Sequence, residues 1–308
     1  MELLLTDDQI NEYKRTGLLV IENVLTEEEV EKARKGLHDQ LLSFGIDHDK
    51  ILSGEQTINE GTRLKSTASK IYYSKWKMDV HLNENVYKYM KQIMNATYFS
   101  GKTKSFEHPF GFSDDILACI DRVCWRLPDI IRSEGGLELH LDRNPFDPYL
   151  KNGEGLNRWR PIQAFVTLTD SYGSESGGLR VVKGFHHEID SYFKKSKPAT
   201  ETKGEFYRLN SLSHVSLAKK LEPIMVPKGS LVCWDNRLPH ATCMKLAGYD
   251  TREVVYVGWL PNVELNKKYV AEQLVGIKSN KPPESYLSDK DWKEDDLTEL
   301  QRKLLGMY

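Results

Sequence analysis

The chain has 308 residues, 43 basic and 45 acidic side chains, and a formal net charge of −2. This balance argues against a nucleic-acid-binding protein, which would carry a basic face or stripe, and no apolar run approaches the length of a bilayer span. The four cysteines lack zinc-type spacing and are too few for a disulfide framework, and the acidic start of the chain is too short for a signal peptide. We therefore expect a soluble cytoplasmic protein with reduced, buried thiols.

The N-terminal region, residues 1–136, is predicted to be mainly helical. The expected elements in chain order are a helix over 6–17, a strand over 18–24, a helix starting after 26 and a helix over 86–94. Thr26 with Glu29 forms a capping box, and the apolar residues that follow recur at helical spacing. Residues 117–131 fit either a strand or a helix.

From residue 137 the pattern changes to short apolar runs separated by turn residues. The expected strands are 137–142, 161–169, 178–183, 223–227, 230–235, 240–244 and 252–260. Many short strands of this kind are typical of a β-sandwich or barrel. The polar stretch 187–222 is a long connection of the kind that often covers a site, and a short amphipathic helix is predicted over 296–305. No domain boundary is apparent, so we predict a single domain.

Two residues in the first of these strands form a candidate metal site. His140 and Asp142 are two residues apart, so their side chains should project from the same face of the strand. His240 lies far downstream, and Arg252 opens a later strand. Two His and one carboxylate with open coordination positions form the ligand set of non-haem Fe(II) oxygenases, and arginine can bind a dicarboxylate co-substrate bidentately. Taken alone, the His-x-Asp pair also fits a strand with one hydrogen-bonded His and one solvated Asp.

Three further runs lie between these candidate ligands: RPIQAFVTLTD (160–170), GGLRVVKGFH (177–186) and VPKGSLVCWD (226–235). They resemble motifs of the phytanoyl-CoA dioxygenase family, and the resemblance extends from about residue 5 to about residue 260. Lys183 and Phe185 stand where that family usually has Pro and Ser. The resemblance implies a mainly β fold with flanking helices. Its regions are a double-stranded β-helix (jelly-roll, cupin-like) core at 137–262, the helical N-terminal region at 1–136 and a C-terminal helical extension at 263–308.

The resemblance also implies the cofactors and the residues that hold them. Fe(II) would be bound by His140, Asp142 and His240, and the co-substrate 2-oxoglutarate by Arg252, with O2 as the second co-substrate. Strand alternation groups further side chains on shared faces, and the resemblance implies that these faces point inward. These candidate cofactor-binding residues are Gln163, Phe165, Thr167 and Tyr256. Phe165 and Tyr256 could equally be plain core residues.

Several polar residues flank the strands that should open on the metal. The candidate substrate-binding residues are Tyr72, Arg143, Asn144, Arg158, Arg160, Asn236 and Arg237. Such arginines would serve an anionic substrate, although each one singly could instead form a surface salt bridge. His186 and His187 follow a strand end and are interpreted as structural.

These observations predict an Fe(II)/2-oxoglutarate-dependent dioxygenase that oxidises an unactivated C–H bond of a small, carboxylate-bearing metabolite. Succinate and CO2 would be co-products. The outcome could be hydroxylation, desaturation or an oxidative cyclisation of the kind that algal kainoid synthases perform. An acyl-CoA hydroxylase and an oxygenase that modifies a macromolecule are the alternatives. The expected partner is a small-molecule substrate, with no nucleic acid and no membrane span, and the sequence leaves the oligomeric state open.

Overall fold

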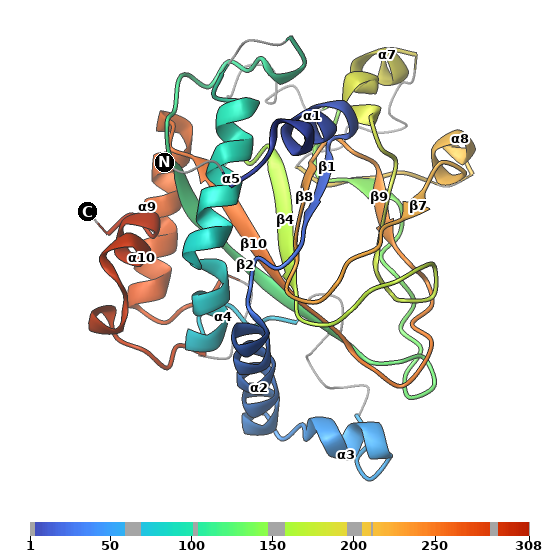
Figure 1. The fold of residues 1–308 in the computed structure, drawn as a ribbon, viewed down its shortest axis with the longest axis vertical. Coiled ribbons are helices and arrows are strands. Elements are labelled where there is room, and N and C mark those ends of the chain that lie inside the picture. The colour runs from blue at the N-terminus through green and yellow to red at the C-terminus, as the bar shows by residue number, and fades with distance from the viewer. Residues whose placement is uncertain are drawn as a thin grey trace.

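Two antiparallel sheets form the centre of the molecule (Figure 1). The computed structural model describes residues 4–58, 69–100, 104–146, 158–195, 205–210, 212–283 and 289–307. Within these residues the larger sheet has five strands, in the order β1 (Leu18–Ile21), β8 (Leu231–Asp235), β4 (Ile162–Thr167), β10 (Arg252–Pro261) and β2 (Ile116–Arg126). The smaller sheet, also of five described strands, has the order β6 (Tyr207–Arg208), β3 (His140–Leu141), β9 (His240–Thr242), β5 (Leu179–Val181) and β7 (Glu222–Pro223).

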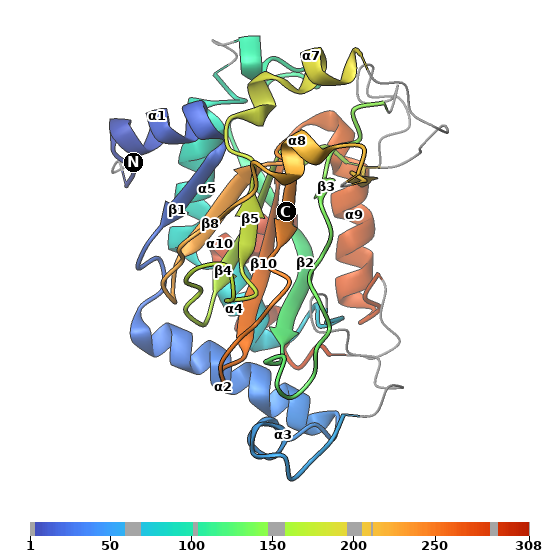
Figure 2. The ribbon, with the colours of Figure 1, turned by 90° about the vertical axis from the view of Figure 1, so that its right-hand side faces the viewer.

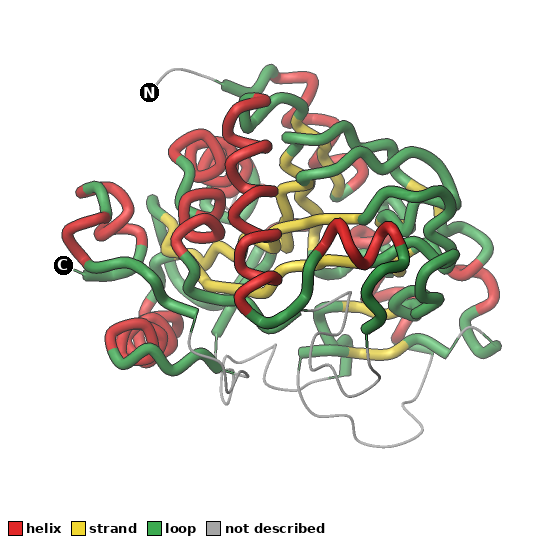
Figure 3. Tube along the Cα trace, turned by 90° about the horizontal axis from the view of Figure 1, so that it is seen from below, coloured by secondary structure: helices red, strands yellow, loops and turns green. Residues whose placement is uncertain are grey.

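Helices cover the side of the larger sheet that faces away from the smaller one (Figures 1 and 3). The α-helices of the described residues are α1 (Asp7–Thr16), α2 (Glu27–Ser43), α3 (His48–Ser53), α4 (Lys75–His81), α5 (Glu84–Ala96), α7 (Ile189–Phe193), α8 (Val215–Ala218), α9 (Glu264–Lys278) and α10 (Glu299–Leu304). Three short 3₁₀ turns are η2 (Lys104–Phe106), η3 (Phe185–His187) and η4 (Glu294–Asp296). None of the helices in this described part is long and apolar enough to cross a membrane.

Strand alternation divides the apolar residues into two cores. On β10, Val255 and Val257 pack into the core between the larger sheet and the helices, whereas Val254 packs with Phe165 in the core between the two sheets. Successive side chains of a strand point to opposite faces, so one strand supplies both cores. Figure 2 shows the molecule from the side, with α9 beyond one edge of the larger sheet. The core between the sheets is the one that surrounds the candidate site.

The N-terminal elements follow the predicted signals closely. Thr6 and Thr26 each cap a helix, and both capping boxes are formed, with Gln9 and Glu29 as the returning side chains. Gly17 ends α1 at φ 73°, a conformation that glycine adopts without steric cost.

The boundaries of the β core differ from the prediction. β1 and β2 come from the region expected to be mainly helical, yet both belong to the larger sheet. Of the region 117–131, which fitted strand or helix, the part up to Arg126 belongs to the strand β2 (Ile116–Arg126). The strand predicted over 137–142 is regular only at 140–141. Before it the chain approaches Thr242 closely: a Cβ on Gly136 would lie 2.7 Å from the Thr242 hydroxyl oxygen.

Candidate active site

The two candidate histidine ligands face each other across a pair of short strands. β3 and β9 are antiparallel, and His140 is directly opposite His240 in their register. Asp142 follows β3, with its carboxylate oxygens 3.7 Å from His140 Nε2 and 3.4 Å from His240 Nε2. Each residue offers one ligand atom, and these atoms lie within 4.8 Å of one another. The structure therefore brings together the three residues that the sequence singled out.

Hydrogen bonds fix which nitrogen of each imidazole is free. His140 Nδ1 is 2.7 Å from the carbonyl of Glu138, and His240 Nδ1 is 2.9 Å from the carbonyl of Leu238. A carbonyl can only accept, so both Nδ1 atoms must donate, and in a neutral imidazole with this tautomer Nε2 keeps its lone pair. Burial, reinforced by neighbouring His240, lowers the pKa of His140 to about 4. His140 is thus neutral at pH 7, the form in which imidazole binds a metal.

The donor set is complete only if a cation lies between the three residues. Two imidazole lone pairs and one carboxylate face the same point, and Asp142 Oδ2 is buried without a hydrogen-bond partner among the described residues. A buried anionic oxygen without a partner is costly. Two His and one carboxylate on one side, with the opposite side open, fit the ligand set of non-haem Fe(II) sites.

A cavity of about 260 Å³ lies beside this triad between the two sheets. Its lining includes His140, Asp142, Gln163, Phe165, Trp234, His240, Arg252 and Tyr256, together with Asp121, Arg122 and Phe206. Of the four residues predicted from strand alternation to face the cofactors, three are therefore in the cavity wall. Thr167 is not: its hydroxyl donates to the carbonyl of Thr169 at 2.6 Å, at the end of β4.

The Arg252 guanidinium is a buried cation in the wall of this cavity. Its Nη1 is 3.1 Å from the Cys124 sulfur, it is hydrogen-bonded to the Tyr256 side chain, and its Cζ is 5.7 Å from the centre of the Phe165 ring. Burial and the nearby Cys124 raise the pKa of Tyr256 to about 12, so the phenol stays neutral. No carboxylate pairs with Arg252 within the described ranges. A buried guanidinium without an anionic partner indicates that the anion comes from a ligand.

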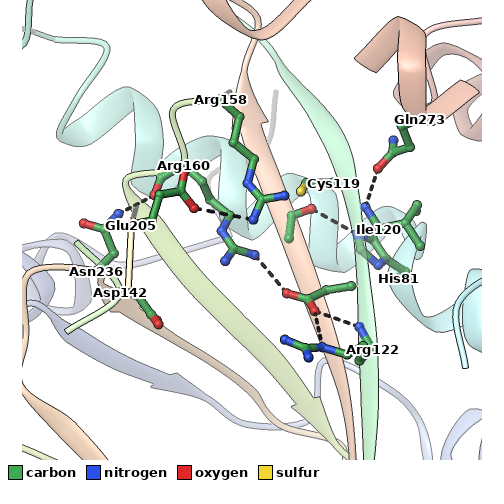
Figure 4. A network of polar contacts seen from close by, with 12 residues as sticks. His81, Cys119, Ile120, Arg122, Asp142, Arg158, Arg160, Glu205, Asn236 and Gln273 are labelled. Carbon is green, nitrogen blue, oxygen red and sulfur yellow. Dashed lines mark hydrogen bonds and ion pairs between the residues drawn. The ribbon is translucent and has the colours of Figure 1, made fainter. Parts of the chain in front are cut away.

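A second cavity of about 230 Å³ adjoins the first and shares Asp121, Arg122, Asp142, Gln163 and Phe206 with it. The predicted substrate residues Tyr72, Arg158 and Arg160 line it, and Figure 4 shows the two arginines. Arg160 Nη1 donates to the Asp121 carboxylate at 2.9 Å, and Arg158 Nη1 donates to the Tyr269 hydroxyl at 2.7 Å.

The other four predicted substrate residues line neither cavity. These are Arg143, Asn144, Asn236 and Arg237. Arg237 forms a buried ion pair with Asp235 at 2.6 Å and donates to the Tyr98 hydroxyl at 3.0 Å. Asn236 donates to the carbonyl of Arg160 at 2.5 Å. The ion pair with Asp235, the last residue of β8, directs the Arg237 guanidinium away from both cavities.

Sequence reasoning missed Asp121, Arg122 and Cys124 on β2. Cys124 contacts Arg252, while Asp121 and Arg122 line both cavities. Had the region been recognised as a strand, its alternation would have aligned Arg122 with Cys124 on one face. His186 and His187 lie within hydrogen-bonding distance of the carbonyl of Lys14, at 3.1 Å and 3.0 Å.

Comparisons with known proteins identify relatives of this chain in sequence and in fold. A curated Dictyostelium discoideum protein named "Putative phytanoyl-CoA dioxygenase" is 22% identical over 327 residues, covering 96% of this chain and 85% of that protein. Among solved structures, the hypothetical protein JW0805 from Escherichia coli, crystallised at high pH, has a TM-score of 0.74 at 17% identity and covers 99% of this chain and 82% of its own. HygX from Streptomyces hygroscopicus, solved with nickel, 2-oxoglutarate and hygromycin B bound, has a TM-score of 0.51 at 17% identity, over 84% of this chain and 88% of its own.

At these identities the two structures show a shared fold. The family is shown by the sequence itself, because the family model described as "Phytanoyl-CoA dioxygenase (PhyH)" matches residues 13–244, which is most of the chain. This chain belongs to the phytanoyl-CoA dioxygenase family.

Proposed function

We propose that this protein is an Fe(II)/2-oxoglutarate-dependent dioxygenase that acts on a small, carboxylate-bearing metabolite. The observation that carries the proposal is the His140, Asp142 and His240 triad beside a cavity that also holds the buried guanidinium of Arg252. In this proposal the two sheets form the double-stranded β-helix expected from the sequence.

The chain's own residues would orient the cofactors. His140, Asp142 and His240 would hold Fe(II) from one side, and Arg252 would pair with the distal carboxylate of 2-oxoglutarate through two parallel hydrogen bonds. Cys124 and Tyr256 fix the guanidinium in the cavity wall. Bound Fe(II) and 2-oxoglutarate together supply O2 activation for C–H oxidation, with succinate and CO2 as co-products.

The apolar residues around the triad would limit access of water. Trp234 packs against His240 with ring centres 5.3 Å apart, and Phe206 stacks on His140 at 4.7 Å. A dry, shaped site protects the oxidation step from competing reactions, which is the protein's contribution in a cofactor enzyme.

The dimensions of the site favour a small substrate. The second cavity, of about 230 Å³, is lined mainly by polar side chains, including Arg158 and Arg160. A carboxylate suits that lining better than the alkyl chain of an acyl group, because burying these charged walls against an alkyl group would cost free energy without any compensating hydrogen bond. In this proposal the enzyme hydroxylates, desaturates or cyclises the substrate at a carbon held beside the triad.

Binding and turnover test this proposal separately. Anaerobic titration should give one equivalent of Fe(II) per chain and one of 2-oxoglutarate, and with O2 the loaded protein should form succinate in the presence of a cell metabolite extract. His140→Ala/His240→Ala should lose iron binding but keep its circular dichroism spectrum. If the double variant still bound one equivalent of iron as tightly as the wild type, the assigned triad would be wrong.

A further inference from the structure

Arg122 occupies a distinctive position between the two cavities. It is on β2, lines both cavities, and its side chain remains 38% exposed although most of its strand is buried. Figure 4 shows Arg122, Arg158 and Arg160 in one polar network near Asp142. The three guanidinium groups differ in how accessible they are to a bound molecule.

Two of these arginines are less exposed and lie close to neighbouring side chains. Arg160 is almost buried and donates to Asp121 at 2.9 Å, while Arg158 donates to Tyr269 at 2.7 Å and reaches Glu205 at 3.5 Å. Arg122 reaches the same Asp121 with its Nε 3.6 Å from the carboxylate. Because its side chain is the most exposed of the three and borders both cavities, Arg122 is the best placed to meet a molecule that enters them.

The position of Arg160 depends on the absence of a side chain on β10. A Cβ on Gly258 would lie 3.2 Å from Arg160 Nη1 and 2.4 Å from the carbonyl of Cys119. The guanidinium of Arg160 thus fills space that any other residue at 258 would take. Burial opposes ionisation of Asp121, but Arg160 and Arg122 outweigh it and hold the pKa of this carboxyl below its ordinary value. Asp121 is therefore ionised and joins the two arginines.

Three arginines and three carboxylates line the second cavity, so one positive charge is left over once Asp142 is assigned to the metal. Apart from the triad carboxylate Asp142, its described charged lining residues are the three arginines and the two carboxylates Asp121 and Glu205. Lys77, fully buried and on α4, adds another positive charge near Asp121. Gln163 also lines the cavity, and its Oε1 is buried with no hydrogen-bond partner among the described residues. The excess positive charge can bind an anionic group of a ligand, and Gln163 Oε1 can accept a hydrogen bond from a donor next to that group. Together they indicate a binding site for an anionic ligand that also carries a hydrogen-bond donor.

We propose that Arg122 is the specificity-determining residue that binds the anionic group of the substrate, with Asp121 and Arg160 as its positioning residues and Gln163 as acceptor for an N–H or O–H group next to that anion. This inference rests on the proposed function and narrows it. The substrate class is a carboxylic acid with a nearby amine or hydroxyl. Its charged end lies in the second cavity, and the carbon to be oxidised lies toward the triad.

The test uses the full chain loaded with Ni(II), which does not support turnover, and with saturating 2-oxoglutarate so that Arg252 is already occupied. The probes are a panel of small amino and hydroxy monocarboxylates, each matched by its primary amide, with binding measured by thermal shift and calorimetry. The wild type should bind some acids at least tenfold more tightly than their amides. Arg122→Gln should lose that preference. Arg122→Lys should keep part of it, since lysine keeps the positive charge but lacks the planar guanidinium that donates two parallel hydrogen bonds.

Arg15→Gln is the matched control, because Arg15 is an exposed arginine on α1 that pairs with Glu12; it should behave as the wild type. The inference is overturned if Arg122→Gln keeps the acid preference, or if no acid in the panel binds the wild type better than its amide. Failure of the wild type to bind Ni(II) and 2-oxoglutarate at all would instead remove the proposed function. Normal loading of Arg122→Gln shows that its loss of acid binding is not a loss of fold.

Discussion

Arg252 and Glu253 are neighbours on β10, yet their charged groups are buried on opposite faces of the larger sheet. Arg252 faces the cavity beside the triad. Glu253 faces α2, where its carboxylate is 2.7 Å from His38 Nε2 and 2.9 Å from Arg34 Nε. The two residues therefore have separable roles: in the proposed function Arg252 binds a ligand, whereas Glu253 attaches α2 to the sheet.

We expect Arg252→Ala to lose 2-oxoglutarate binding with little change in the free energy of unfolding of the unliganded protein. Losing one bidentate ion pair in a closed site costs about 2–5 kcal/mol of binding, and Arg252→Lys should recover only part of it because lysine lacks the planar fork. Calorimetric titration of 2-oxoglutarate into the Fe(II)-loaded protein under anaerobic conditions measures this. Unchanged affinity in both variants would contradict the assignment of Arg252.

Glu253→Gln should show the opposite pattern. The carboxylate accepts from Arg34, His38 and Thr251, and its side chain is fully buried. Removing the charge from such a pair should lower the free energy of unfolding by about 3 kcal/mol, while the affinity for 2-oxoglutarate stays close to that of the wild type. Urea unfolding and the same titration measure the two quantities. A variant of wild-type stability that bound 2-oxoglutarate weakly would show that the two faces are not independent.

The stability of the metal-free protein should fall as the pH is lowered from 7 to 5, in part through His81. This histidine is fully buried on α4; its Nε2 is 3.0 Å from the carbonyl of Gly258, and its Nδ1 has no partner among the described residues. Burial, together with the charge of Lys77, lowers the pKa of His81 to about 3. Because the unfolded chain takes up this proton near pH 6.5 and the folded chain does not, the stability present above pH 6.5 is progressively lost down to about pH 3.

At pH 5 the loss from His81 alone should be about 2 kcal/mol. His81→Gln keeps a donor for the Gly258 carbonyl and removes the titrating group, so it should flatten the pH dependence by that amount. Urea unfolding of both proteins at pH 5 and 7 measures the difference. Equal slopes for wild type and variant would show that His81 does not contribute.

Arg237→Ala should destabilise the protein rather than change its substrate preference. It would leave the fully buried carboxylate of Asp235 with only the Tyr98 hydroxyl as a side-chain partner among the described residues. Breaking a buried ion pair on one side costs about 3–5 kcal/mol, and adding Asp235→Asn should restore part of that loss. Thermal unfolding of the single and double variants measures the effect. A stable Arg237→Ala variant with altered affinity for carboxylates would contradict this prediction and indicate that Arg237 binds the substrate.

A local rule paired His140 with Asp142 in the sequence, whereas His240 and Arg252 were assigned from the family resemblance. Two residues on one strand share a face whatever surrounds them, so His140 and Asp142 could be paired without a structure. The loop residue Arg237 could not be placed, because only the tertiary structure shows that its side chain turns back to the buried carboxylate of Asp235 and to the Tyr98 hydroxyl. Nothing in the sequence distinguishes Arg237 from Arg158.

Arg122 was missed for a different reason. β2 is buried along most of its length, so its sequence, ILACIDRVCWR, lacks the alternation that identifies a strand with one solvated face. Such a run fits a buried helix segment as well as a strand. The sequence therefore does not predict to which side the side chains of Asp121 and Arg122 point. In the structure both residues line both cavities.

The pairing of His140 with His240 has a consequence for folding. The two strands that carry them are only two and three residues long, so backbone hydrogen bonds alone hold this part of the smaller sheet weakly. A metal ion bound to both imidazoles would act as a crosslink that closes the chain between residues 140 and 240 and removes loop entropy from the unfolded state, as a disulfide does. Backbone amides around β3 and β9 should therefore exchange with solvent much more slowly in the metal-loaded protein than in the metal-free one.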